Sequence, residues 1–228
     1  MAGSPGAVVL LSGGLDSSVL LHHAVKQLRK TPVFTLSFDY GQRHARELDC
    51  ADWQAEAAGV AKHTVLDVSF LGPLVASGTT LVRGGAEVPD FETLCETDLD
   101  QPPTYVPNRN MMLLSMAAAY AEAHGVTDVY YGAQARDEYG YWDCTAEFLK
   151  RINEVLSLNR RQAITVHAPF VASLKSDAVR LGAELGVDFT HTWSCYRGGV
   201  AACGTCPTCV ERLKAFADAG LTDPLQYA

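Results

Sequence analysis

The sequence predicts an α/β fold: an open, doubly wound parallel sheet with a smaller cysteine-rich region near its C-terminal end. Apolar segments typical of strands alternate along the chain with segments typical of helices. This order implies right-handed crossovers between parallel strands. Because ligands of such sheets bind at the carboxyl ends of the strands, we expect the functional site at that edge.

Five strands and five helices make up the expected alternation. Strands are predicted where short segments are apolar or alternate in polarity: 7–11, 33–38, 63–68, 128–132 and 164–167. Helices are predicted in the longer segments between and after them: 17–29, 43–58, 109–124, 146–158 and 175–185. The last helix should stop before Gly186, since glycine readily adopts the left-handed conformation that ends helices.

Two segments depart from this alternation. The first is 69–106, which contains several prolines and glycines and is much longer than an ordinary connection. Segments of this kind are usually lids, binding loops or disordered. The second is a cysteine-rich ribbon that follows Thr190. Its final helix is predicted to begin at Pro207. We therefore divide the chain into a domain at 1–190, with its long loop at 69–106, and a metal-binding region at 191–228.

The composition indicates a globular domain that acts on a small molecule. The chain has 228 residues, 48% of them hydrophobic, which is ample for a substantial core. Its formal net charge is −8, and no basic cluster exceeds Arg160-Arg161, which argues against direct nucleic-acid binding. Seven cysteines favour metal ligation and a reducing compartment. We also expect neither a signal peptide nor a membrane span, and so a cytoplasmic protein.

The most informative motif is Ser12-Gly13-Gly14-Leu15-Asp16-Ser17-Ser18, directly after the first predicted strand. A strand that passes through glycines into a helix gathers backbone N–H groups around a small concavity, and such a concavity binds phosphate. Glycine also lets an anion approach the backbone closely. The alternative is an ordinary glycine-rich turn. The predicted nucleotide-binding residues are Leu10, Leu11, Ser12, Gly13, Gly14, Leu15, Asp16, Ser17 and Ser18.

The cysteine run predicts a metal site. Cys195, Cys203, Cys206 and Cys209 supply four soft ligands within fifteen residues, enough for one tetrahedral zinc ion per chain. A site filled by four sulfur ligands is structural, because a catalytic zinc keeps an open position. An iron–sulfur cluster is the alternative.

Six motifs, in order, resemble those of one enzyme family. The glycine loop resembles that of the PP-loop ATP pyrophosphatases, which split ATP into AMP and pyrophosphate. With the cysteines, four further segments resemble successive motifs of the QueC family: D-Y-G-Q-R-H-x-x-E at 39–47, Y-V-P-N-R-N at 105–110, D-x-x-G-Y-x-D-C at 137–144 and T-W-S-C-Y-R-G-G at 192–199.

The resemblance implies a PP-loop fold of the adenine nucleotide α-hydrolase type and a zinc-bound homodimer. It implies an ATP-dependent ligase that converts 7-carboxy-7-deazaguanine and ammonia into the nitrile 7-cyano-7-deazaguanine (preQ0) of queuosine biosynthesis. The reaction would use two ATP with Mg²⁺ and pass through an adenylated carboxylate and an amide.

One motif departs from the family pattern. Where the family usually has S-G-Y-P-D-C-R, this chain has Y-G-Y-W-D-C-T at 139–145. A hydroxyl, a rigid turn and a cation are lost together, which leaves open an enzyme that stops at the amide or transfers the carboxylate to another amine, including a protein amine. A tRNA-modifying PP-loop enzyme and a zinc module without catalysis are the remaining alternatives.

The implied chemistry selects candidate site residues. Adenylation makes a carboxylate oxygen a good leaving group, and the charge that develops requires N–H groups and cations, so the candidate catalytic residues are Ser12, Asp16, Arg43, Arg109 and Lys175. A flat heterocycle requires stacking faces and hydrogen-bonding groups, so the candidate substrate-binding residues are Tyr40, Gln42, Arg43, Tyr105, Asp137, Tyr141 and Asp143. Surface arginines, a solvated lysine, turn carboxylates and core aromatics are the plainer alternatives.

Overall fold

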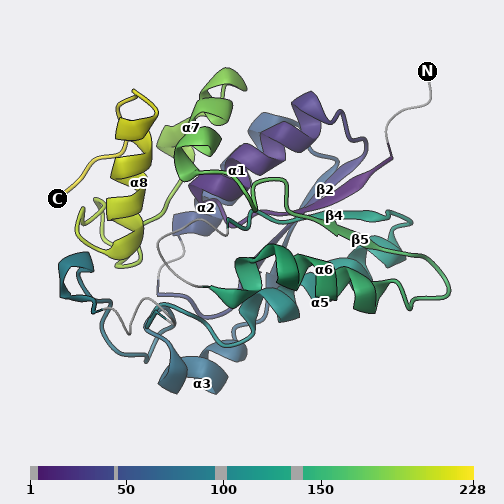
Figure 1. The fold of residues 1–228 in the computed structure, drawn as a ribbon, viewed down its shortest axis with the longest axis horizontal. Helices are drawn as coiled ribbons and strands as arrows, with labels where there is room; N and C mark the ends of the chain where they lie inside the picture. Colours follow the sequence, from purple (N-terminus) through teal and green to yellow (C-terminus); the bar gives the residue numbers. More distant parts are fainter. Residues whose placement is uncertain (1–4, 44–45, 96–101, 135–140) are drawn as a thin grey trace.

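A five-stranded parallel sheet forms the centre of the molecule (Figure 1). The computed structural model describes residues 5–43, 46–95, 102–134 and 141–228. The strands lie in the order β3-β2-β1-β4-β5, and each neighbouring pair is parallel. Their bounds are Ala7–Leu10 (β1), Val33–Asp39 (β2), Lys62–Asp67 (β3), Asp128–Tyr130 (β4) and Thr165–His167 (β5). The predicted α/β class and parallel sheet are confirmed.

Helices cover both faces of the sheet (Figure 1). They are α1 (Leu15–His22), α2 (Arg46–Ala58), α5 (Arg109–Ala123), α6 (Ala146–Leu156), α7 (Lys175–Glu184) and α8 (Pro207–Asp218). A π-helical turn, His23–Gln27, extends α1. One core joins α1, α2, α7 and α8 to the sheet, and a second joins α5 and α6 to it. The doubly wound arrangement follows from these two cores.

The central strand β1 shows why the sheet is covered twice. Ala7 and Val9 pack into the core of α1 and α7, whereas Val8 packs into the core of α5 and α6. Successive side chains of a strand point to opposite faces, so a strand that is apolar at every position is suited to burial on both. All three residues are completely buried.

The long segment 69–106 is more ordered than a loop in its described parts. It contains the short helix α3 (Leu71–Val75) and two 3₁₀ turns, Ala76–Gly78 and Phe91–Thr93. Four of its buried side chains, Val75, Leu81, Val82 and Val88, share a core with the cysteine ribbon. The described parts of this segment, 69–95 and 102–106, therefore pack against the ribbon, and we call them the packed arm.

No helix within the described ranges combines the length and the apolar character needed to cross a membrane.

Candidate active site

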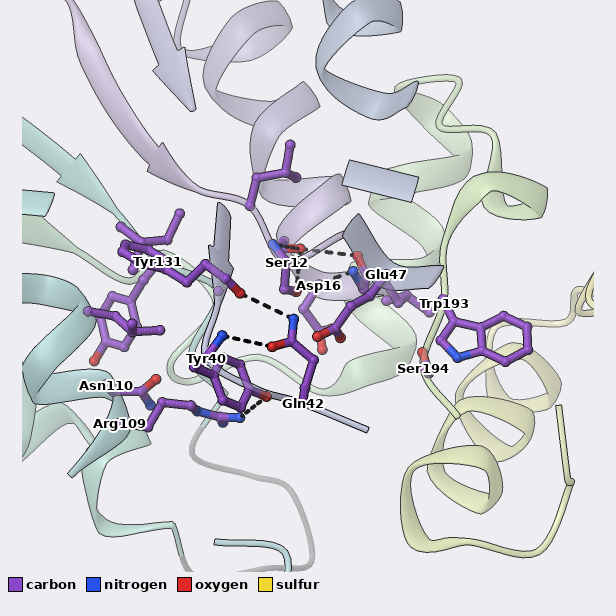
Figure 2. A pocket seen from close by; sticks show the side chains of 18 of the residues that line it. Ser12, Asp16, Tyr40, Gln42, Glu47, Arg109, Asn110, Tyr131, Trp193 and Ser194 are labelled. Atoms are coloured by element: carbon purple, nitrogen blue, oxygen red, sulfur yellow. Dashed lines mark hydrogen bonds between the residues drawn. The ribbon is translucent and has the colours of Figure 1, made fainter. Parts of the chain in front are cut away.

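A cavity of about 280 Å³ opens at the carboxyl ends of β1, β2 and β4 (Figure 2). Its walls come from the glycine loop, the segment after β2 with the start of α2, the start of α5, the residues after β4, and the cysteine ribbon. Ten of the predicted site residues line it: Leu10, Leu11, Ser12, Gly14, Leu15, Asp16, Ser17, Tyr40, Gln42 and Arg109. This is the edge at which an open parallel sheet binds its ligand.

The glycine loop is held by its own hydroxyl groups. The side-chain oxygens of Ser12 and Ser17 lie 3.0 Å apart, and Ser12 Oγ accepts a hydrogen bond of 3.2 Å from the backbone N–H of Gly14. Ser18 Oγ donates to the Gly14 carbonyl at 2.8 Å. The loop is thus preorganised at the N-terminus of α1, where the helix dipole favours an anion.

Gly13 fits this loop for a steric reason. Its φ is +80°, and a Cβ added there would lie 1.9 Å from the backbone oxygen of Glu47. Any other residue would push α2 away from the loop. The loop therefore lies directly against the first turn of α2, which brings the Glu47 backbone beside the concavity of the loop.

Lys175, the first residue of α7, reaches the loop from a distant part of the chain. Its Nζ lies 3.9 Å from a carboxylate oxygen of Asp16 and 2.8 Å from Oε2 of Glu211 on α8. Glu211 was not predicted as a site residue, because it follows the last cysteine, Cys209, and lies outside the motifs. A cation is thereby held next to the glycine loop.

Arg109 and Tyr40 form the opposite side of the cavity (Figure 2). Nη1 of Arg109 donates to the Tyr40 hydroxyl at 3.3 Å. Burial alone would lower the pKa of Arg109, but Tyr40, Tyr196 and Asp143 raise it overall, so the guanidinium stays charged. Burial also raises the pKa of Tyr40. The site therefore holds a fixed cation beside a neutral phenol.

The backbone at the start of α5 aims Arg109 at the cavity. Asn108, the N-cap residue, has the left-handed φ of 54°, which asparagine tolerates better than most residues. Its N–H donates to the Tyr105 hydroxyl at 2.9 Å, and the indole N–H of Trp142 donates to the same oxygen at 2.8 Å. Tyr105 thus ties the start of α5 to the segment that differs from the family pattern.

That segment is well integrated where the structure describes it. Thr145, in the place of the family's arginine, caps α6 by accepting a hydrogen bond of 3.1 Å from the Phe148 N–H. Trp142 packs edge-on against Phe148, and the Tyr141 hydroxyl lies 2.6 Å from Thr104 Oγ1. The substituted residues at 142 and 145 therefore have structural contacts of their own.

Asp143, one of the two candidate carboxylates near this segment, is buried. Asp143 is only 3% exposed, and burial raises the pKa of its carboxyl although Arg109 opposes the shift. Its neighbour Cys144 lines the cavity. Asp137 lies outside the described residues.

Gln42 lines the cavity, whereas Arg43 is not among its lining residues and binds the neighbouring segment 80–85. Oε1 of Gln42 accepts a hydrogen bond of 2.9 Å from the Tyr40 N–H, and its Nε2 donates to the Phe38 carbonyl. Arg43 donates to the carbonyls of Thr80 and Gly85, each at 2.7 Å. The guanidinium of Arg43 therefore anchors the packed arm to the segment before α2.

Several cavity-lining residues were not among the predicted site residues. Among them are Glu47, Asn110, Tyr131, Cys144, Trp193, Ser194, Tyr196 and Thr208. Glu47, Asn110, Cys144, Trp193, Ser194 and Tyr196 all lie within the motif segments, so the motifs carried a signal for them. Burial raises the pKa of Glu47 to about 7 although Arg109 opposes the shift.

The four cysteines form a compact cluster beside the cavity. The sulfur atoms of Cys195, Cys203, Cys206 and Cys209 all lie within 4.8 Å of one another. Tetrahedral ligation with Zn–S distances of about 2.3 Å places sulfur atoms roughly 3.8 Å apart, so the cluster fits a four-thiolate metal. The ribbon that carries it contacts the glycine loop directly, since the backbone N–H of Trp193 donates to the Gly13 carbonyl at 2.9 Å.

Comparison with known proteins places this arrangement in a family. The model of the family described as "Queuosine biosynthesis protein QueC" matches residues 6–220. A "7-cyano-7-deazaguanine synthase" from Marinomonas sp. is 39% identical, with 98% of this chain and 99% of that protein covered. One from Thermoplasma acidophilum is 42% identical, with 97% and 91% covered. One from Marinobacter nauticus is 44% identical, with 96% of both covered.

Among solved structures, an NH3-dependent NAD synthetase from Campylobacter jejuni aligns with a TM-score of 0.46 and 14% identity, over 84% of this chain and 68% of that chain. The family match and the full-length relatives carry the assignment. This chain therefore belongs to the QueC family of queuosine biosynthesis proteins.

Proposed function

We propose that this chain is an ATP-dependent ligase that converts 7-carboxy-7-deazaguanine and ammonia into 7-cyano-7-deazaguanine. The observation that carries the proposal is the cavity itself, in which a phosphate-type loop on one side faces a buried cation and a phenol, Arg109 and Tyr40, on the other. The relatives named 7-cyano-7-deazaguanine synthase support the substrate and product.

In this proposal the loop side binds the nucleotide. The N-terminus of α1, the loop N–H groups and Lys175 bind the departing pyrophosphate, since they place positive potential where negative charge leaves. Asp16 and the loop serines orient these groups. The carboxylate of the substrate is then adenylated, which makes its oxygen a good leaving group.

The Arg109 side binds the substrate. A guanidinium pairs with a carboxylate or phosphate through forked hydrogen bonds, and Tyr40 offers a face for a flat ring. Asp143 and, among the residues outside the described ranges, Asp137 are proposed to accept ring N–H groups. Tyr105 and Tyr141 support this wall, Gln42 lines the cavity, and Arg43 anchors the packed arm beside it.

The nitrile is favoured over the amide as the final product. The relatives at 39% to 44% identity carry the name of the nitrile-forming enzyme. The residues that replace the family pattern at 142 and 145 have structural roles, because Trp142 bonds to Tyr105 and Thr145 caps α6. These structural roles account for Trp142 and Thr145 without a change in the reaction.

The proposal includes one structural zinc per chain, held by Cys195, Cys203, Cys206 and Cys209, and Mg²⁺ as the ion that accompanies ATP. It further includes ammonia as the nitrogen donor, a homodimer and a cytoplasmic location. The domain at 1–190 would carry the ATP site and the region at 191–228 the zinc. Elemental analysis and light scattering measure the metal content and the oligomeric state.

The direct test is product analysis by mass spectrometry. The purified protein is incubated with ATP, Mg²⁺, ammonium and 7-carboxy-7-deazaguanine, and we expect the nitrile, with two AMP formed for each nitrile. A product that stops at the amide would support the amide-forming alternative. An unchanged substrate with no AMP formed would contradict the proposed function.

A further inference from the structure

The proposed reaction releases protons from nitrogen in both of its stages, and this inference rests on that proposed function. When ammonia attacks the acyl adenylate, a C–N bond forms, the C–O bond to AMP breaks with its electron pair leaving on AMP, and the nitrogen loses one proton. When the adenylated amide becomes the nitrile, the second C–O bond breaks and the nitrogen loses its two remaining protons. A base within reach of the reacting carbon accelerates both stages.

Two carboxylates line the cavity among the described residues, Asp16 and Glu47. Asp16 lies on the glycine loop, 3.9 Å from the ammonium group of Lys175. The carboxylate of Asp16 therefore lies beside the cation on the phosphate side of the cavity, where it is suited to organising the loop.

Glu47 enters the cavity from a different element, the first turn of α2 (Figure 2). Its backbone oxygen adjoins Gly13 of the glycine loop, and its carboxylate interacts electrostatically with Arg109 on the opposite wall. The side chain thus lies between the proposed phosphate side and the proposed substrate side. In both stages the C–O bond between the substrate carbon and AMP joins these two sides, so Glu47 lies near the bond that breaks.

The groups around Glu47 leave its carboxylate able to gain and lose a proton near neutral pH. Burial raises the pKa of Glu47 to about 7, Arg109 and the Gln42 amide act in the opposite direction, and Asp39 adds to the rise. Tyr40 is a neutral phenol at this pH because burial raises its pKa. Catalytic bases work best with a pKa close to the working pH.

We propose that Glu47 is the general base that accepts the proton from ammonia as it attacks the acyl adenylate and then, one at a time, the two protons that the nitrogen loses as the adenylated amide becomes the nitrile. In each transfer a proton moves from nitrogen to a Glu47 carboxylate oxygen, and AMP leaves with the C–O electron pair once in each stage. The protonated carboxyl then returns its proton to solvent between the steps. Glu47 is thereby a catalytic residue of the ligase beyond the phosphate loop and the arginine.

The test separates adenylation from nitrogen transfer in Glu47→Gln. Adenylation is followed by exchange of labelled pyrophosphate into ATP with 7-carboxy-7-deazaguanine present and ammonium absent. We expect this exchange within about threefold of wild type, because no nitrogen proton moves in that step. Amide formation from ammonium, followed in a single turnover, should fall by about a hundredfold or more.

Hydroxylamine provides a second measurement on the same variant. It is unprotonated at neutral pH, and the proton it carries after attack is more acidic, so water removes it readily. With hydroxylamine in place of ammonium, the defect of Glu47→Gln should shrink to less than about tenfold. The matched control is Glu56→Gln, an exposed glutamate of the same helix, which should behave as wild type in every assay.

Three results would overturn the role of Glu47. Near-normal amide formation from ammonium in Glu47→Gln would show that no base is needed there. Loss of pyrophosphate exchange would assign Glu47 to the nucleotide instead. An equal defect with ammonium and hydroxylamine would assign it to substrate positioning. A wild-type protein that exchanges no pyrophosphate and forms no amide would overturn the proposed function itself, and so is distinguishable from these results.

Discussion

The ammonium group of Lys175 lies 2.8 Å from the carboxylate of Glu211, so the first residue of α7 is paired with the helix that begins within the cysteine cluster. Both side chains are largely buried, with 16% and 14% of their surface exposed. The same ammonium lies 3.9 Å from Asp16 of the glycine loop. The position of this cation is therefore determined jointly by the glycine loop and by the cysteine ribbon.

Replacing Glu211 should impair nucleotide use. In Glu211→Gln, Lys175 loses the closer of the two carboxylates described above and the cation is less well positioned, so we expect the KM for ATP to rise by about tenfold, which corresponds to about 1.4 kcal/mol. Steady-state kinetics measure this change. Glu184→Gln, an exposed glutamate on α7, is the matched control. A metal content below that of wild type in Glu211→Gln would assign the effect to the cluster instead.

The glycine loop should be required for turnover and dispensable for folding. Asp16→Asn or Ser12→Ala should lower kcat by at least about tenfold, a loss of about 1.4 kcal/mol of transition-state stabilisation or more. The melting temperature should stay close to that of wild type, since both residues lie at the cavity. Rates near those of wild type in both variants would contradict the assignment of this loop.

The cysteine cluster should couple metal binding to folding. Cys203→Ser removes one of four ligands, so the variant should lose its metal by elemental analysis and unfold at a lower temperature, because metal-binding energy is folding energy at such sites. Cys95→Ser, at an exposed cysteine outside the cluster, is the control. A stable, active and metal-free Cys203→Ser protein would refute the structural role of the metal.

The buried environment of Glu47 should make stability depend on pH. The pKa of Glu47 is raised from 4.5 to about 7 in the folded chain. Its stabilising contribution is therefore complete below about pH 4.5 and is lost as the pH rises through 7. Glu47→Gln has no such titration, so its melting temperature relative to wild type should be higher at about pH 8 than at about pH 5. A pH-independent difference would contradict the raised pKa.

Substrate recognition should depend on Asp143. Its carboxyl is 3% exposed beside the Arg109 wall, and removing a buried hydrogen-bond partner costs about 1–3 kcal/mol. We expect Asp143→Ala to raise the KM for 7-carboxy-7-deazaguanine by roughly tenfold or more while the KM for ATP changes little. A parallel rise in both constants would place Asp143 at the nucleotide.

The alternation of apolar segments predicted the sheet because each strand and helix is local in sequence. The helix over 175–185 was predicted to end before Gly186, and α7 ends at Glu184, close to that expectation. The first helix begins earlier than the predicted 17–29, at Leu15, because Gly14 serves as its N-cap. Such boundaries depend on backbone hydrogen bonds that periodicity does not encode.

The site was predicted in part, for a physical reason. Ser12 and Asp16 are adjacent to a strand and share one loop, so their place follows from the motif. The Lys175–Glu211 pair and the hydrogen bonds of Arg43 to the packed arm join residues 36 or more positions apart. Contacts of that kind depend on how the ribbon and the arm pack, which no local pattern specifies. Whether the segment 69–106 is ordered depends on the same kind of packing, so its sequence alone does not predict it.

The hydrogen bond from the Trp193 N–H to the Gly13 carbonyl gives the cysteine ribbon a thermodynamic consequence. When binding at one site changes the affinity of another, binding at the second changes the affinity of the first by the same factor. Because this hydrogen bond joins the two proposed sites, a metal bound by the four thiolates should tighten nucleotide binding, and a bound nucleotide should raise the affinity for the metal by the same factor.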